Sequence, residues 1–359
     1  MGYAHPGVLL FLRGTTLMRQ PFDTTELRLT GEPIPVAEAI GLPGGNSAAF
    51  SASHTGVLVY VTDRQVANNR RLVWVDRKGG VMPLALAPGV YDSPALSPNG
   101  QQVVLAVRDT TGEHIWVYDL ARGTFDKRTF DGPGDNFPIW SRDGTFLTFT
   151  RGPSPGFVGP IMRLRADGSG TTELLVSEAH LQGNKVAGSW SADGRLLTIQ
   201  HAGNVVVRDA EGVFHPILAT GANEREARFS PNGLWFSYRS NETGRWQVYV
   251  QSYPPGNGKW QISTDGGAQA MWAPNGRELF FLSGNRMMAA EVEPGPTFKA
   301  GTPRALFEMP LAETAPDDPS RYAVTPDARR FLVLTTVAEE KAATPPLTVV
   351  LNYAQALKR

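Results

Sequence analysis

Short polar segments that could hold a ligand recur along this 359-residue chain, each just ahead of a similar turn. They carry carboxylates, amides, a tyrosine and basic groups, which bind ligands through hydrogen bonds and ion pairs. If the segments converge, they form a polar ring that binds a peptide, a protein or a small ligand. The predicted binding residues are Tyr91, Asp92, Asp135, Asn136, Lys185, Asn223, Glu224, Arg225, Glu226 and Gln269.

Two other interpretations of these side chains stay open. The acids could perform hydrolase or lyase chemistry, which needs convergent carboxylates or a bound metal. Alternatively, the side chains are solvated loop residues or bond neighbouring structural units to one another. Because the sequence displays no catalytic constellation, we expect a non-catalytic binding protein with no cofactor and no metal.

Other catalytic motifs are excluded by their neighbouring residues, by their spacing or by the composition. Residues 152–156 match the Gly-x-Ser-x-Gly pattern of a nucleophile elbow, but prolines flank Ser154 and a second Pro/Gly segment replaces the required helix. The six histidines lack the paired spacing of a metal site. The chain has no cysteine, so disulfides, thiolate-bound metals and thiol nucleophiles are excluded. We therefore predict no catalytic residue.

The composition excludes further classes of protein. Lys+Arg and Asp+Glu both number 34, so the zero net charge gives no global basic footprint for nucleic acid. No apolar run is long enough to span a membrane. The apolar segment at residues 8–12 has no basic region before it, so we expect no signal peptide in this chain.

The elements that position the polar segments follow from an internal repeat. Each copy has an apolar residue, a turn of the Ser-x-Asx-Gly type and an alternating strand. The apolar residues stand at positions 50, 96, 140, 190, 229, 272 and 324, so the repeat averages about 46 residues. That period matches the four short strands of a β-propeller blade.

We therefore predict a single all-β domain over residues 1–359, a β-propeller of four-stranded blades. Complete blades are expected at about residues 46–90, 91–133, 134–182, 183–221, 222–266 and 267–309. The incomplete ends, residues 7–40 and 320–353, are expected to pair in a composite closing blade that removes exposed strand edges. Seven blades are favoured, with eight or six as alternatives. The polar segments then lie where one blade leads into the next, at one rim of the central channel.

The Ser-Pro-Asn/Asp-Gly units, such as residues 97–100 and 230–233, resemble the repeats of TolB-type, WD-like bacterial β-propellers over nearly the whole chain. Residues 7–13, 16–23 and 223–229 resemble, more specifically, the C-terminal propeller region of bacterial eukaryotic-like serine/threonine kinases, as do residues 29–33 and 347–353. In that family the propeller lies outside the cytoplasm, beyond a kinase domain and a membrane span. The resemblance implies an extracytoplasmic or periplasmic sensor that binds a protein, peptide or small ligand at one face. No kinase domain occurs in this chain, so kinase activity is assigned to none of its residues.

Overall fold

The structure is a computed structural model that describes residues 2–4, 7–13, 16–38, 40, 50–53, 55–61, 69–109, 111–132, 134–152, 159–256, 258–293, 295–310, 320–337 and 347–351. Throughout these ranges the chain forms β-strands, turns and bends, and no helix. The all-β prediction is therefore confirmed. Within the same ranges there is no helical segment of the length and apolarity that a membrane crossing needs. Ser154 and its neighbours lie outside the described residues.

The strands group into two compact units rather than the single domain expected. The smaller unit comprises residues 1–68 and 338–359, and the larger unit comprises residues 69–337. One hydrophobic core lies wholly in the smaller unit, and six lie wholly in the larger one. A repeat pattern in the sequence does not reveal this division, because both units are built from similar short strands.

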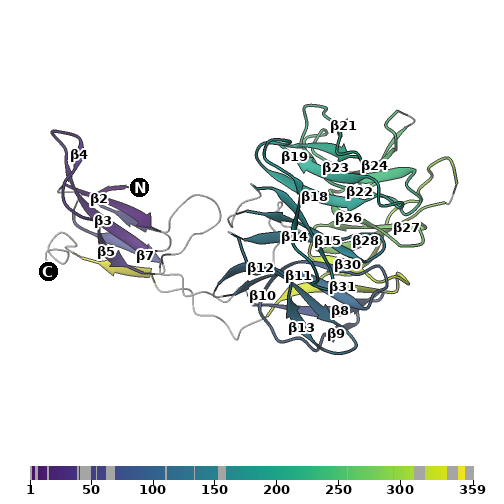
Figure 1. Ribbon diagram of the computed structural model, residues 1–359, viewed down its shortest axis with the longest axis horizontal. Helices are drawn as coiled ribbons and strands as arrows, with labels where there is room; N and C mark the ends of the chain where they lie inside the picture. Colours follow the sequence, from purple (N-terminus) through teal and green to yellow (C-terminus); the bar gives the residue numbers. More distant parts are fainter. Residues whose placement is uncertain are drawn as a thin grey trace. The chain divides into compact units, whose positions relative to one another are not determined.

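The larger unit contains six four-stranded antiparallel sheets in its described residues, where the sequence favoured seven blades (Figure 1). Five of these sheets take their strands consecutively, and each lies within one predicted blade range, to within one residue. They are β10 (Val90–Leu96), β11 (Gln102–Asp109), β12 (Gly112–Asp119) and β13 (Phe125–Lys127); β14 (Asp135–Trp140), β15 (Phe146–Arg151), β16 (Ile161–Arg165) and β17 (Glu173–Val176); β18 (Lys185–Trp190), β19 (Leu197–His201), β20 (Asn204–Arg208) and β21 (Phe214–Leu218); β22 (Glu224–Phe229), β23 (Trp235–Ser240), β24 (Gln247–Ser252) and β25 (Lys259–Gln261); and β26 (Ala268–Trp272), β27 (Glu278–Ser283), β28 (Arg286–Glu291) and β29 (Arg304–Glu308).

The sixth sheet, here called the closing sheet, joins the two ends of the larger unit. Its order is β30 (Tyr322–Val324), β31 (Arg330–Thr336), β8 (Arg70–Asp76) and β9 (Val81–Pro83). Strands β8 and β31 lie side by side in Figure 1 and pair over seven residues. Residues 320–336 thus pair with residues 70–83, not with residues 7–40 as predicted. The seven-residue ladder to β8 provides the hydrogen bonds that β31 needs on its second edge.

Six hydrophobic cores hold the larger unit together, and each is shared by two sheets. The cores join successive sheets from β10–β13 to β26–β29, and two more join the closing sheet to its neighbours on either side. For example, Phe280 and Phe331 meet edge to face at 5.0 Å between β27 and β31. The sequence supplies these cores because apolar residues, most often Val, Ile, Leu or Phe, recur along the second and third strands.

The smaller unit has two sheets around one small core. Strands β2, β3 and β5 from residues 7–40 pair among themselves, and β7 pairs with the C-terminal β32. The predicted blade at 46–90 is therefore divided between the two units. The strands are β1 (Gly2–Ala4), β2 (Val8–Arg13), β3 (Thr16–Asp23), β4 (Arg28–Leu29) and β5 (Ile34–Ala37) in one sheet, and β6 (Phe50–Ala52), β7 (Leu58–Val61) and β32 (Leu347–Val350) in the other.

The repeated turns have the chemistry that the sequence predicts. In the turn after β10, the Ser97 hydroxyl donates to Asn99 Oδ1 at 2.7 Å and accepts from the Gln102 N–H at 2.9 Å. Gly100 has φ of +68°, the left-handed conformation that glycine adopts most readily. The interpretation of these Asx residues as turn formers is confirmed. Each turn connects the first strand of a sheet to the second, and it thereby fixes the direction of the first strands.

Candidate functional site

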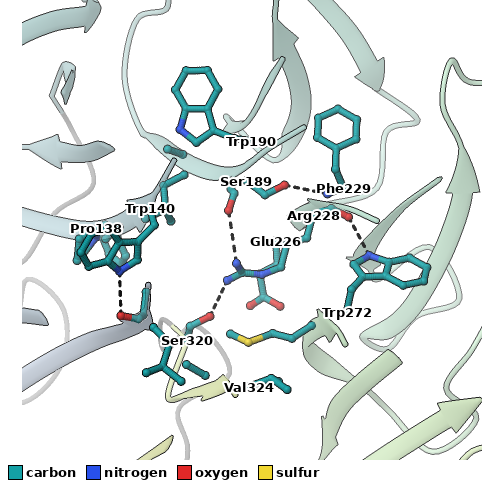
Figure 2. Close-up of a pocket in the computed structure, with 18 of the residues that line it drawn as sticks. Pro138, Trp140, Ser189, Trp190, Glu226, Arg228, Phe229, Trp272, Ser320 and Val324 are labelled. Carbon is teal, nitrogen blue, oxygen red and sulfur yellow. Dashed lines mark hydrogen bonds between the residues drawn. The ribbon is translucent and has the colours of Figure 1, made fainter. Parts of the chain in front are cut away.

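A cavity of about 410 Å³ lies at the centre of the larger unit, where the first strands of all six sheets meet. Its walls are mostly apolar, with a few polar groups pointing inward (Figure 2). Its lining includes Pro94, Phe137, Pro138, Trp140, Arg142, Gly188, Ser189, Trp190, Arg225, Glu226, Arg228, Phe229, Arg239, Met271, Trp272, Ser320 and Val324.

A β-bulge in the first strands directs side chains into this cavity. In β10, β14, β22 and β26 the register with the second strand shifts, and a residue within each shift has a positive φ although it is not glycine. These residues are Ser93, Phe137, Glu226 and Gln269, with φ between 49° and 60°. Such a bulge twists its strand and re-aims the side chains that follow. The left-handed backbone is unfavourable for these residue types, so surrounding contacts must hold it.

Glu226, in the bulge of β22, has partners for both carboxylate oxygens. Oε1 forms an ion pair with Arg239 Nε at 3.1 Å, and Oε2 accepts the Gln269 N–H of the next sheet at 2.6 Å. Arg239 lies on β23 with only 4% of its side chain exposed, and its guanidinium lies 4.5 Å from the centre of the Trp246 ring. Glu226 therefore ties β22 both to its own sheet and to its neighbour.

Arg228 extends from the end of β22 into the middle of the cavity (Figure 2). Nη2 donates to Ser320 Oγ at 2.7 Å, Nη1 donates to the Gly188 carbonyl at 3.5 Å, and Nε is buried with no hydrogen-bond partner. Burial lowers the pKa of Arg228, and the Glu226 carboxylate opposes that shift. An arginine stays protonated in proteins and has five N–H donors. The cavity therefore contains a cation whose donors are only partly used.

Indole rings form much of the apolar wall. Trp140, Trp190 and Trp272 are each the last residue of a first strand. Each indole N–H donates to the preceding sheet: to the Ala95 carbonyl at 3.1 Å, to a threonine hydroxyl of β15 at 3.2 Å, and to the Arg228 carbonyl at 3.1 Å. Because these N–H groups are already bonded, the rings offer apolar surface to a ligand.

The predicted residues of β10 and the first residue of β14 are bonded to other groups of the protein. The Tyr91 hydroxyl donates to the Ala87 carbonyl at 2.7 Å, and burial raises the pKa of Tyr91. Asp92 forms an ion pair with Arg70 of the closing sheet at 3.3 Å. The fully buried Asp135 pairs with Arg151 at 2.7 Å.

Asn136 of β14 and Lys185 of β18 are likewise bonded to other groups of the protein. Asn136 donates to Glu113 at 2.9 Å in the preceding sheet, and it accepts the Ser93 hydroxyl at 3.2 Å. The fully buried Lys185 pairs with Glu178, and this hydrogen bond lowers the pKa of Glu178.

The remaining predicted residues lie on or beside β22 and β26. Asn223 is exposed at the start of β22. The fully buried Glu224 accepts the Thr220 hydroxyl through Oε1, and Oε2 is buried with no hydrogen-bond partner. Arg225 lies over the Trp246 ring at 5.4 Å. Gln269 accepts the Arg321 N–H at 3.0 Å and the Tyr322 hydroxyl at 2.7 Å, which bonds β26 to the closing sheet.

Of the ten predicted residues, the structure places two, Arg225 and Glu226, in the lining of the cavity. The other eight lie outside its lining. Sequence reasoning missed Arg228, Ser320 and the three tryptophans. One signal was present: the residue just before the apolar anchor of each repeat is Ala49, Ala95, Ile139, Ser189, Arg228, Met271 or Ala323, and only one of these is charged.

Few acids lie near the cavity. Glu226 is the single acidic residue among the described residues that line it. Across the described ranges, no cluster of three His, Asp or Glu side chains is arranged to hold a metal ion. The polar chemistry of the cavity is therefore dominated by arginine and serine.

Comparison with known proteins agrees with the observed architecture. No family model matches the sequence, and no curated protein matches it. The structure is similar to a protein provisionally described as TolB from Agrobacterium tumefaciens, with a TM-score of 0.62 and 17% identity over 76% of this chain and 99% of that chain. TolB from Acinetobacter baumannii matches with a TM-score of 0.49 and 14% identity over 91% and 78%. A chain of a nidogen/laminin complex matches with a TM-score of 0.50 and 10% identity over 62% and 89%. The match to the Agrobacterium tumefaciens protein supports a TolB-like β-propeller fold.

Proposed function

We propose that the larger unit is a non-catalytic binding module that takes a protein segment, a peptide or a small ligand into its central cavity. The observation that carries the proposal is the cavity itself, to which all six sheets contribute. Its volume of about 410 Å³ lies within the range of small-molecule sites, roughly 300–1,000 Å³. Apolar walls with a few inward polar groups are also typical of such sites.

A second observation is that the frame of the cavity is held by polar contacts between every pair of neighbouring sheets. A frame that is fixed before binding reduces the entropy lost when a ligand enters. Around the unit, these contacts are Ser93 with Asn136, Thr150 with the Lys185 carbonyl, Thr198 with the Ala227 carbonyl, Glu226 with the Gln269 N–H, Gln269 with Tyr322, and Arg70 with Asp92.

The contacts of Glu226, the acid in the described lining of the cavity, favour binding over hydrolase or lyase chemistry. A general acid or base must exchange a proton with its substrate. The carboxylate of Glu226 instead contacts Arg239 and the Gln269 N–H, which are structural partners. An acid held in this way uses both oxygens to stabilise the fold.

The segments that resemble bacterial kinase propellers extend the proposal. In that family the propeller lies outside the cytoplasm, so we propose an extracytoplasmic location and a sensor role for this module. Nidogen, one of the structural neighbours, is seen in complex with laminin, which illustrates that a similar fold takes part in protein complexes. The partner of this chain is accordingly proposed to be a protein, a peptide or a small ligand.

The test is to fill the cavity and follow binding. A phage library of random heptapeptides is selected on the native protein, and the enriched peptides are titrated against Met271→Trp and Val324→Trp, which both place a large ring in the cavity lining. Leu174→Trp is the control, because Leu174 is 58% exposed on β17. We expect both cavity variants to lose binding and the control to retain it. No enriched peptide, or full binding by folded cavity variants, would contradict the proposal.

A further inference from the structure

The cavity has an excess of positive charge. Four arginines lie among its described lining residues, Arg142, Arg225, Arg228 and Arg239, against the single acid Glu226. Arg239 is neutralised by its ion pair with Glu226, and Arg225 lies over the Trp246 ring. Arg142 is exposed on the turn after β14. The charge that remains in the middle of the cavity is that of Arg228.

Among the described residues, Arg228 forms no ion pair, although the Glu226 carboxylate favours its charged form. Its two hydrogen-bond acceptors among the described residues are neutral oxygens, the Ser320 hydroxyl at 2.7 Å and the Gly188 carbonyl at a long 3.5 Å. Nε has no hydrogen-bond partner in the described part of the chain. Both oxygens of Glu226, the acid in the described lining, have other partners. A buried charge that is incompletely paired is costly, so a ligand anion at this point would gain a strong charge-assisted bond.

The apolar walls of the cavity favour an anion that is attached to an apolar group. Trp140, Trp190, Trp272 and Phe229 surround Arg228 with apolar surface (Figure 2). The indole N–H groups are already bonded to neighbouring strands. A strongly hydrated anion would lose its water here without replacement, whereas a carboxylate attached to an apolar body would bury that body against the rings.

We propose that Arg228 binds a carboxylate carried by an apolar or aromatic group, as in a peptide with an acidic residue next to an aromatic one. This inference rests on the proposed binding function and names the ligand chemistry. One guanidinium matches one carboxylate through parallel N–H bonds. Ser320 shares the guanidinium, and Ser189 lies beside it in the lining. A free aromatic acid has the same chemistry as the peptide, and the experiment separates the two sources.

The experiment compares acid and amide forms of two probes by calorimetric titration. The first probe is a capped peptide with a central tryptophan–aspartate pair, and its partner has asparagine in place of aspartate. The second is N-acetyltryptophan, with N-acetyltryptophanamide as its partner. We expect at least one acid to bind the native protein about tenfold or more tightly than its amide, as a charge-assisted hydrogen bond provides. Binding of the peptide alone or of the free acid alone identifies the source.

Substitution assigns the preference to one residue. Arg228→Gln is expected to abolish the difference between acid and amide while the amide still binds, and Arg228→Lys is expected to reduce it. Arg142→Gln, at the exposed turn of the same cavity, should keep the difference. The unfolding midpoint of each variant shows whether it is folded. If Arg228→Gln does not fold, the comparison is made with Arg228→Lys.

Several results would overturn the inference. If acid and amide bind the native protein equally, the carboxylate has no special partner, yet the cavity still binds and the proposed function stands. If Arg142→Gln removes the preference as completely as Arg228→Gln, the effect belongs to the overall charge of the cavity. If neither acid binds, the carboxylate inference fails, while the displayed peptide library still decides separately whether the cavity binds peptides.

Discussion

Strands β14 and β22 occupy equivalent places around the cavity and have the same bulge, but their side chains differ in kind. β14 places Phe137 at the left-handed position, where β22 has Glu226. Ile139 of β14 corresponds to Arg228 of β22, since each is the residue just before the apolar anchor. The backbone geometry is therefore common to both strands, and two side chains decide whether a stretch of the wall is apolar or charged.

The two strands also differ in their buried acids. Asp135 and Glu224 begin β14 and β22, and neither side chain has exposed area. The residue opposite Asp135 in the register is Arg151, whereas the residue opposite Glu224 is Ser240. Equivalent acids thus have a full ionic partner in one strand and an incomplete set of partners in the other.

The largest expected effect comes from removing charge at these two acids. Asp135→Asn should lower the free energy of unfolding by about 3 kcal/mol, because Arg151 loses the partner of a mostly buried ion pair. Glu224→Gln should change it by about 1 kcal/mol or less, because one of its oxygens has no hydrogen bond to lose. Denaturant titration of both variants measures the difference. Equal losses of unfolding free energy in the two variants would contradict the proposed difference between the two acids.

A smaller effect is expected at the last residue of β14, because Trp140 has an indole N–H that Phe229, the last residue of β22, lacks. Trp140→Phe removes the indole N–H bond to the Ala95 carbonyl and should cost about 1–2 kcal/mol of unfolding free energy. Trp272→Phe, which loses the equivalent bond to the Arg228 carbonyl, should cost a similar amount. Thermal unfolding followed by circular dichroism tests this. Native-like stability in both variants would show that these bonds contribute nothing.

The smallest effect concerns the turns that follow the two strands, which contain Asp143 and Asn232. The pKa of Asp143 is lowered from 3.8 to about 2, because it accepts the Ser141 hydroxyl and the N–H and hydroxyl of Thr145. A lowered pKa adds stability that is complete above about pH 4 and is lost as the pH falls towards 2. Because Asp143 is exposed, the contribution should be about 1 kcal/mol or less.

Replacing this acid by the amide of its counterpart isolates that contribution. Asp143→Asn should fold normally, since Asn232 makes the equivalent bond to the Ser230 hydroxyl at 2.7 Å. Unfolding midpoints of the native protein and the variant are compared at pH 5, 4, 3 and 2. The native protein should lose slightly more stability than the variant between pH 4 and pH 2. Parallel curves would show that the pKa shift has no energetic consequence.

Much of the fold followed from the sequence because its signals are local. The turn at residues 97–100 and the strands on either side lie within a few residues of one another, so residue type and spacing were sufficient. The closing sheet was predicted incorrectly because its key pairing, between β8 and β31, joins residues more than 250 positions apart. Local pattern does not distinguish β7 from β8 as the partner of a distant strand.

The candidate site was predicted less well for a related reason. The segments ahead of the repeated turns were predicted to supply the polar groups, but the bulge changes which side chains reach the cavity. Arg228 follows the bulge and enters the lining, whereas Asp135 and Lys185 precede it and are buried between strands. The contact between Arg228 and Ser320 spans 92 residues, and no periodicity in the sequence indicates it.

The closing sheet also determines how the larger unit would respond to tension. Its chain ends leave from the same end of one antiparallel pair, where Arg70 pairs with Thr336 and the Val337 N–H donates to the Asn69 carbonyl at 3.1 Å. A pull on the two ends would load these hydrogen bonds one after another, so the pair would unzip at low force. Shear would load all of them together. The same arrangement makes residues 69–337 a cassette that can be inserted into a loop of another protein, since its ends already meet.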